Sequence, residues 1–209
     1  MKYINYMKGR KITMNEVQPI RSQKKILAIK NYIKGPDYNK TYRERDYLLL
    51  IMGINCALRI RDLLALKVSD IITKEGNIKK YLHVDTTKTN KKLQIKINDS
   101  IVKALNYYLE HVKAIDPDDY LFKSKAGKKL DRVRAWGLVK DWTKAVGLTD
   151  ENYGTHTLRK TWATMAVTNF NVPIRTVSKK LGHKTIASTM DYIGITQREV
   201  NDAEDLVCL

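Results

Sequence analysis

The sequence contains little cysteine, proline or glycine. Its 209 residues include two cysteines, four prolines and ten glycines. Cys56 lies in an apolar run and Cys208 near the C-terminus, without the paired spacing of a disulfide framework or a zinc site. Few prolines and glycines argue against long disordered linkers. We therefore expect a cytoplasmic protein that needs no metal or cofactor and folds over most of its length.

Long apolar segments are missing as well. The longest apolar run, residues 47–58, is interrupted by Gly53 and Asn55 and is too short to span a bilayer. The N-terminus is basic but lacks the apolar core of a signal peptide. Nothing in the sequence predicts membrane anchoring or export.

Acidic residues are few relative to basic ones. The chain has 39 Lys and Arg against 22 Asp and Glu, a formal charge of +17 and a pI of about 9.7. Such a charge favours a polyanionic partner, with nucleic acid ahead of an anionic membrane surface. Basic residues concentrate in segments 74–96 and 123–144, where we expect contacts with phosphates. The tail 199–209 is acidic instead, and we expect it to pack on a protein surface, in the same chain or on a neighbouring protomer.

Length and hydrophobic periodicity predict one domain that is mainly helical. Residues 1–16 look like a basic arm and residues 17–209 like the domain itself. Helical spacing comes first, at 17–33 and 41–57. Alternating apolar and polar residues then predict three antiparallel strands, at 68–72, 81–86 and 93–97. The predicted helices after the sheet cover 101–112, 131–146, 157–170, 173–181, 188–193 and 197–206.

Five separated residues carry groups that could act together on a phosphodiester. They are Arg59, His156, Arg159, His183 and Tyr192. Arginines can clamp a phosphodiester, histidines can donate hydrogen bonds or move protons, and a tyrosine hydroxyl can attack phosphorus. Taken singly, each also has an ordinary interpretation as a helix cap, a solvated polar residue or a packing residue. Lys88, in the turn between the second and third predicted strands, is by itself an ordinary solvated lysine.

The order and spacing of these residues are more informative than any one of them. The motifs, in chain order, are Ala57-Leu58-Arg59, His156-Thr157-Leu158-Arg159, Leu181-Gly182-His183, and Tyr192 nine residues further on. With these motifs the chain resembles the catalytic domain of the tyrosine recombinase (phage integrase) family, from about residue 17 to residue 199. The resemblance implies an α+β, mainly α fold, a helical DNA breaking-rejoining domain with a small three-stranded antiparallel sheet. Lys160 departs from the pattern, because many members carry histidine there.

The resemblance also implies a separate catalytic role for each of these residues at the phosphodiester. Arg59 and Arg159 would stabilise the charge of the transition state. Tyr192 would attack phosphorus, form a 3′-phosphotyrosyl intermediate and expel a 5′-hydroxyl, so that rejoining needs no ATP.

Three further residues would handle protons and hydrogen bonds. Lys88 would act as general acid for the leaving alkoxide. His156 would accept the tyrosine proton or bond the phosphate, and His183 would donate to a non-bridging oxygen.

The partners that the resemblance implies are double-stranded DNA, further copies of the chain in a tetrameric synapse, and accessory DNA-bending or directionality proteins. Members usually carry a separate N-terminal helical domain, for which residues 1–16 are too few. We expect a short stand-alone recombinase, with an excised catalytic fragment as the alternative. Two other activities remain open: DNA relaxation of the type IB topoisomerase kind, and DNA binding by a non-catalytic regulator.

Overall fold

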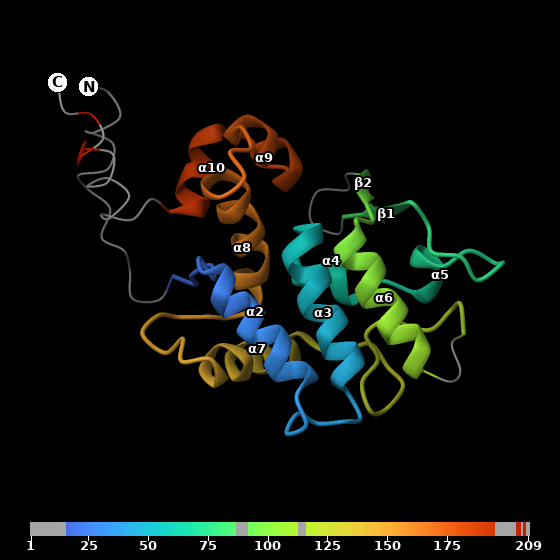
Figure 1. The fold of residues 1–209 in the computed structure, drawn as a ribbon. Helices are drawn as coiled ribbons and strands as arrows, with labels where there is room; N and C mark the ends of the chain where they lie inside the picture. The colour runs from blue at the N-terminus through green and yellow to red at the C-terminus, as the bar shows by residue number, and fades with distance from the viewer. Residues whose placement is uncertain (1–15, 87–91, 113–115, 195–203, 206, 208–209) are drawn as a thin grey trace.

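The computed structural model describes residues 16–86, 92–112, 116–194, 204–205 and 207. The elements, in chain order, are α2 (Gln23–Lys34), α3 (Arg43–Cys56), α4 (Ile60–Leu64), α5 (Val68–Ile71), β1 (Tyr81–Asp85), β2 (Lys92–Lys96), α6 (Asp99–His111), α7 (Arg132–Ala145), α8 (Thr155–Thr168), α9 (Ile174–Leu181) and α10 (Ile186–Ile193) (Figure 1). The fold is mainly helical with a small antiparallel sheet, which confirms the predicted class. Within the described ranges, no helix has the length and apolarity needed to cross a membrane. The predicted arm, except for Glu16, and most of the predicted helix 197–206 lie outside the described residues.

The sheet has two strands in the described part of the chain, and the prediction of three is wrong. β1 and β2 pair antiparallel, with Leu82 opposite Ile95. The expected first strand, 68–72, forms the short helix α5 instead. The Asp70 carboxylate accepts a hydrogen bond from the backbone N–H of Lys67 at 2.8 Å and so caps this helix. An alternation of apolar and polar residues over only five positions does not distinguish a strand from one helical turn. Here the cap by Asp70 favours the helical turn.

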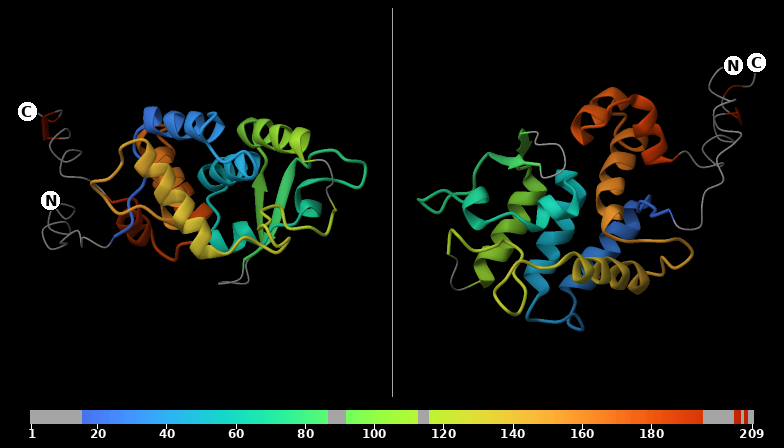
Figure 2. Two further views of the ribbon diagram at one scale, coloured as in Figure 1. Left: turned by 90° about the horizontal axis from the view of Figure 1, so that it is seen from below. Right: turned by 180° about the vertical axis from the view of Figure 1, so that it is seen from behind.

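Two apolar clusters hold the helices together, and α8 contributes to both. The larger cluster includes buried residues of α2, α3, α6, α7 and the sheet, together with Leu158 of α8. The smaller joins α8 to α9 and α10 through residues such as Ala163, Val177 and Ile193. Figures 1 and 2 show α9 and α10 gathered at one end of α8, away from the sheet. Thus α8 connects the main body to the last two helices.

The contact between α3 and α8 depends on a glycine. A Cβ atom at Gly53 would lie 2.5 Å from Leu158 Cδ1 and 3.0 Å from Leu158 Cβ. The two helices can approach this closely only because residue 53 has no side chain. Since α8 also carries two of the predicted site residues, the contact sets their distance from the end of α3.

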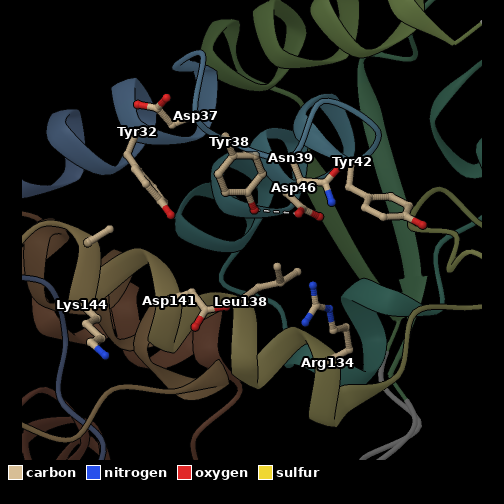
Figure 3. A pocket seen from close by; sticks show the side chains of 11 residues that line it. Tyr32, Asp37, Tyr38, Asn39, Tyr42, Asp46, Arg134, Leu138, Asp141 and Lys144 are labelled. Atoms are coloured by element: carbon tan, nitrogen blue, oxygen red, sulfur yellow. Dashed lines mark hydrogen bonds between the residues drawn. The ribbon is translucent and has the colours of Figure 1, made fainter.

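A buried polar network attaches α7 to α3. The Tyr38 hydroxyl donates to Asp46 Oδ2 at 2.7 Å and accepts from Trp142 Nε1 at 3.0 Å. Arg45 Nε donates to the other carboxylate oxygen of Asp46 at 2.8 Å. Figure 3 shows Tyr38 facing Asp46 in a pocket whose opposite side is formed by α7. These bonds satisfy a carboxylate that is 2% exposed, and they fix α7 relative to α3.

Candidate active site

Arg59 lies between the end of α3 and the start of α4. Ala57 ends α3 with a left-handed backbone (φ 54°), and Arg59 is the N-cap residue of α4 with an extended backbone. Arg59 borders an open hollow of about 760 Å³ between α4, α7 and α8. The residues that line it are Arg59, Ile60, Arg61, Arg132, Val133, Trp136, Thr155 and His156. Arg59 and His156 therefore share one hollow. Three arginines line this hollow, counting Arg59.

Arg159 is buried in α8 and is oriented by two backbone carbonyls. Its Nη1 donates to Ala57 O at 2.5 Å and its Nη2 donates to Leu181 O at 2.6 Å. Each carbonyl belongs to a motif that also contains another predicted site residue, Arg59 or His183. Burial lowers the pKa of Arg159, and the neighbouring Tyr192 hydroxyl acts in the opposite direction. Arg159 thus links the end of α3 to the end of α9.

Tyr192 stands in the last turn of α10 with its hydroxyl group directed toward these arginines. Its ring meets the ring of His183 edge to face, with centroids 5.2 Å apart. Burial raises the pKa of Tyr192, while the positive charges of Arg159 and Arg59 lower it. Within the described ranges the buried hydroxyl has no hydrogen bond of normal geometry, although the Arg159 guanidinium lies near it. Burying a hydroxyl without a well-formed hydrogen bond is costly, and the nearby Arg159 guanidinium is the group that offsets this cost.

His183 follows a left-handed glycine at the end of α9. Gly182 has φ 67°, and its N–H bonds back to carbonyls of α9. Nδ1 of His183 lies 2.9 Å from Thr189 Oγ1 of α10. Partial burial lowers the pKa of His183, and Arg159 and Arg59 lower it further. The ring is therefore neutral near pH 7, with Nε2 left to face other groups.

His156 stands in the first turn of α8 at the edge of the hollow. Desolvation lowers its pKa, and four cations add to the effect: Arg159, Lys160, Arg59 and Arg132. His156 is also partly open to solvent at this edge. Near pH 7 His156 is a neutral imidazole in a strongly positive surrounding.

Five of the six predicted site residues thus gather around the ends of α3, α8, α9 and α10. The sixth, Lys88, lies outside the described residues, in the stretch between β1 and β2. In the described ranges, no three His, Cys, Asp or Glu side chains are grouped as ligands for a metal ion. The catalytic roles of the six residues remain predictions.

The sequence assigned no role to two residues that contact this site. Lys160, which is 5% exposed, places Nζ 5.2 Å from the ring centroid of Tyr192 and 2.8 Å from Glu16 Oε1. Thr189 orients His183, as described above. A lysine whose neighbours in a helix are all buried is usually paired with an acidic side chain, and this is the signal that could have identified Lys160. No comparable signal in the sequence connects Thr189 with His183.

Comparison with known proteins agrees with this architecture. The model of the phage integrase family matches residues 20–199. The probable integrase/recombinase YoeC of Bacillus subtilis (strain 168) is 38% identical over 185 residues, which cover 88% of this chain and 93% of YoeC. Tyrosine recombinase XerC of Caldanaerobacter subterraneus subsp. tengcongensis is 29% identical over 207 residues, 95% of this chain but only 57% of XerC. A crystal structure of XerA recombinase superposes with a TM-score of 0.70 at 22% identity, covering 94% of this chain and 66% of XerA.

At this low identity the solved structure supports the fold alone, whereas the sequence matches show the family. The chain belongs to the phage integrase family.

Proposed function

We propose that the protein is a site-specific DNA recombinase that cuts and rejoins DNA through a 3′-phosphotyrosyl intermediate on Tyr192. The observation that carries the proposal is the buried Tyr192 hydroxyl beside Arg159, whose guanidinium is oriented by two backbone carbonyls. Family membership and the similarity to proteins named recombinases add support.

The arginines would bind the scissile phosphate. A guanidinium has five N–H donors, and the two bonds to Ala57 O and Leu181 O leave about three for Tyr192 and a phosphate oxygen. Because backbone atoms already orient Arg159, little reorganisation is needed when charge develops on the non-bridging oxygens. Arg59, at the edge of the open hollow, would contact the same phosphate.

Proton transfer would use the neutral histidines and Lys88. Arg159 and Arg59 favour the phenolate of Tyr192, which partly offsets the effect of burial on its pKa. His156, with its lowered pKa, is in the form that can accept the tyrosine proton. If the Thr189 hydroxyl donates to Nδ1 of His183, the imidazole proton stands on Nε2 and can bond a phosphate oxygen. Lys88 would protonate the leaving 5′-oxygen.

Double-stranded DNA would be held mainly through its phosphates. Lysines in the loop before α7 are exposed, as are the arginines of its first turn. Exchange between two duplexes would need four protomers at the synapse, and accessory DNA-bending or directionality proteins would set the outcome. Residues 17–209 would form the catalytic domain and residues 1–16 a basic arm.

Detection of a covalent protein–DNA adduct would test the proposal, and it does not require the target sequence to be known. The protein is incubated with a library of nicked duplexes whose centres are randomised, and complexes that survive denaturing detergent are recovered and sequenced. We expect adducts enriched in one sequence, with DNA joined through its 3′-phosphate. Tyr192→Phe should abolish them, because it removes only the attacking oxygen.

Three other outcomes would contradict the proposal. Binding without any adduct would indicate a regulator. Adducts without sequence enrichment, together with relaxation of supercoiled plasmid, would indicate a topoisomerase. Adducts that persist in Tyr192→Phe would assign the nucleophile elsewhere.

A further inference from the structure

The end of α10 is held by an arginine from the other end of the described chain. Arg21 Nη2 donates to Gly194 O at 2.9 Å and to Ile193 O at 3.3 Å. These carbonyls directly follow Tyr192 in the sequence. The last turn of α10 contains no basic residue, so Arg21 supplies the positive charge that a helix C-terminus favours.

The same N-terminal segment contacts Tyr192 by a second route. Glu16 Oε1 lies 2.8 Å from Nζ of Lys160, and that ammonium stands over the Tyr192 ring at 5.2 Å from its centroid. The Glu16 carboxylate therefore fixes a cation against the face of the ring. Arg21 grips the backbone beside Tyr192, and Glu16 acts on the ring through Lys160.

The segment is itself fixed to α8 and to the loop before it. The backbone N–H of Gln18 donates to Asn152 O at 2.8 Å, and that of Ile20 donates to Thr161 Oγ1 at 2.8 Å. Ile20 is 2% exposed and belongs to the larger apolar cluster. Hence the segment can transmit the position of α8, which carries Arg159, to α10, which carries Tyr192.

We propose that residues Glu16 to Arg21 form a clasp that sets the position of Tyr192 relative to Arg159, with Arg21 as the principal positioning residue. As a role in catalysis, this rests on the proposed function. The clasp adds to the contacts that α10 makes with α8 and α9 through the smaller apolar cluster and through the Thr189–His183 pair. Of the eight residues of α10 only Thr189 and Ile193 are buried. Segments with so few buried contacts open easily, and polar anchors then decide where they rest.

The test compares Arg21→Ala with Lys24→Ala. Lys24 is exposed, lies three residues further along the chain and carries the same charge, so its substitution reproduces the loss of charge without touching α10. The first measurement is amide hydrogen exchange of residues 186–194 in the free protein. The second is the single-turnover rate of adduct formation at saturating DNA, set beside the affinity for the same DNA.

We expect Arg21→Ala to speed exchange in α10 and to slow adduct formation by about tenfold to a hundredfold, the usual consequence of a displaced reacting group. Affinity for DNA should match that of Lys24→Ala. Arg21→Lys should recover part of the rate, because an ammonium can still donate to one carbonyl. Glu16→Gln, at a side chain that is 32% exposed and therefore outside the folded core, should slow adduct formation several-fold.

Equal exchange in α10 and equal adduct rates for Arg21→Ala and Lys24→Ala would overturn the clasp. A parallel fall of DNA affinity and rate in Arg21→Ala alone would also overturn it, because it would make Arg21 a DNA contact. If the unsubstituted protein forms no adduct, the proposed function fails. In that case the exchange measurement still decides whether the clasp holds α10.

Discussion

Gly53→Ala adds one methyl group where α3 meets α8, and its effect can be estimated from three distances. The new Cβ would lie 2.5 Å from Leu158 Cδ1, 3.2 Å from its Cγ and 3.0 Å from its Cβ. Leu158 Cδ1 can move by rotation of the side chain, at a cost of about 0.5–1.5 kcal/mol if it leaves its rotamer well. Leu158 Cβ is fixed to the backbone, so α8 itself must withdraw by a few tenths of an ångström.

Two opposing terms set the change in the free energy of unfolding. Alanine in a helix interior is favoured over glycine by about 1 kcal/mol. Overpacking of a close contact costs about 1–3 kcal/mol. We therefore expect Gly53→Ala to lower the free energy of unfolding by about 0–2 kcal/mol. Because α8 carries Arg159 and His156, the rate of adduct formation should fall about threefold to tenfold, more than so small a change in stability explains.

Chemical denaturation and single-turnover cleavage would measure both effects. Gly137→Ala in α7 is the matched control, since a Cβ there has no neighbour within 4 Å and should stabilise the protein by up to about 1 kcal/mol. Combining Gly53→Ala with Leu158→Ala should give a favourable coupling of at least about 0.5 kcal/mol, because the second change removes the Cγ and Cδ1 contacts and leaves only the one with Cβ. The reasoning would be refuted if Gly53→Ala stabilised the protein as Gly137→Ala does and left the rate unchanged.

Three other predictions concern different parts of the molecule. Tyr38→Phe should lower the free energy of unfolding by about 1–3 kcal/mol in denaturation experiments, because it removes the hydroxyl group that bridges Asp46 and Trp142; an unchanged value would show that other groups satisfy both. The pKa values of His156 and His183 are lowered from 6.5, so the unfolded chain takes up protons first and stability should fall as pH drops below about 6.5; replacing both with Asn should flatten that dependence. An unaltered pH profile would contradict the assignment. Replacing three exposed lysines with Gln should reduce the slope of log affinity for DNA against log salt by about 0.9 for each phosphate that the protein no longer neutralises, and an unchanged slope would place the DNA elsewhere. These lysines are Lys125, Lys128 and Lys129.

Hydrophobic spacing located the helices better than it indicated the contacts between them. Apolar spacing is a property of one segment, so helices such as α3 and α7 could be located from it alone. The strand predicted at 68–72 is wrong because five alternating residues fit a strand and a single helical turn equally well. The turn forms here because the Asp70 carboxylate caps it.

Interactions between residues far apart in the sequence could not be predicted from local sequence patterns. Nothing local connects Arg21 with the carbonyl of Gly194, which lies 173 residues further on. The same holds for Glu16 and Lys160. The family pattern marks Lys160 only as a departure, yet its ammonium faces the ring of Tyr192. Such pairs are determined by packing, which a pattern along one chain does not encode.

The short motifs around the site have a reason in the backbone as well as in the side chains. Arg59 and His183 are each preceded, two residues earlier, by a residue whose carbonyl accepts a bond from Arg159. At Ala57 this requires a left-handed backbone, which costs a non-glycine residue about 1–2 kcal/mol. The cost is tolerated because the carbonyl satisfies a buried guanidinium that would otherwise lack a partner on that side. The motifs therefore orient Arg159 with main-chain atoms, and in the proposed function the Arg59 guanidinium and Nε2 of His183 would contact the phosphate.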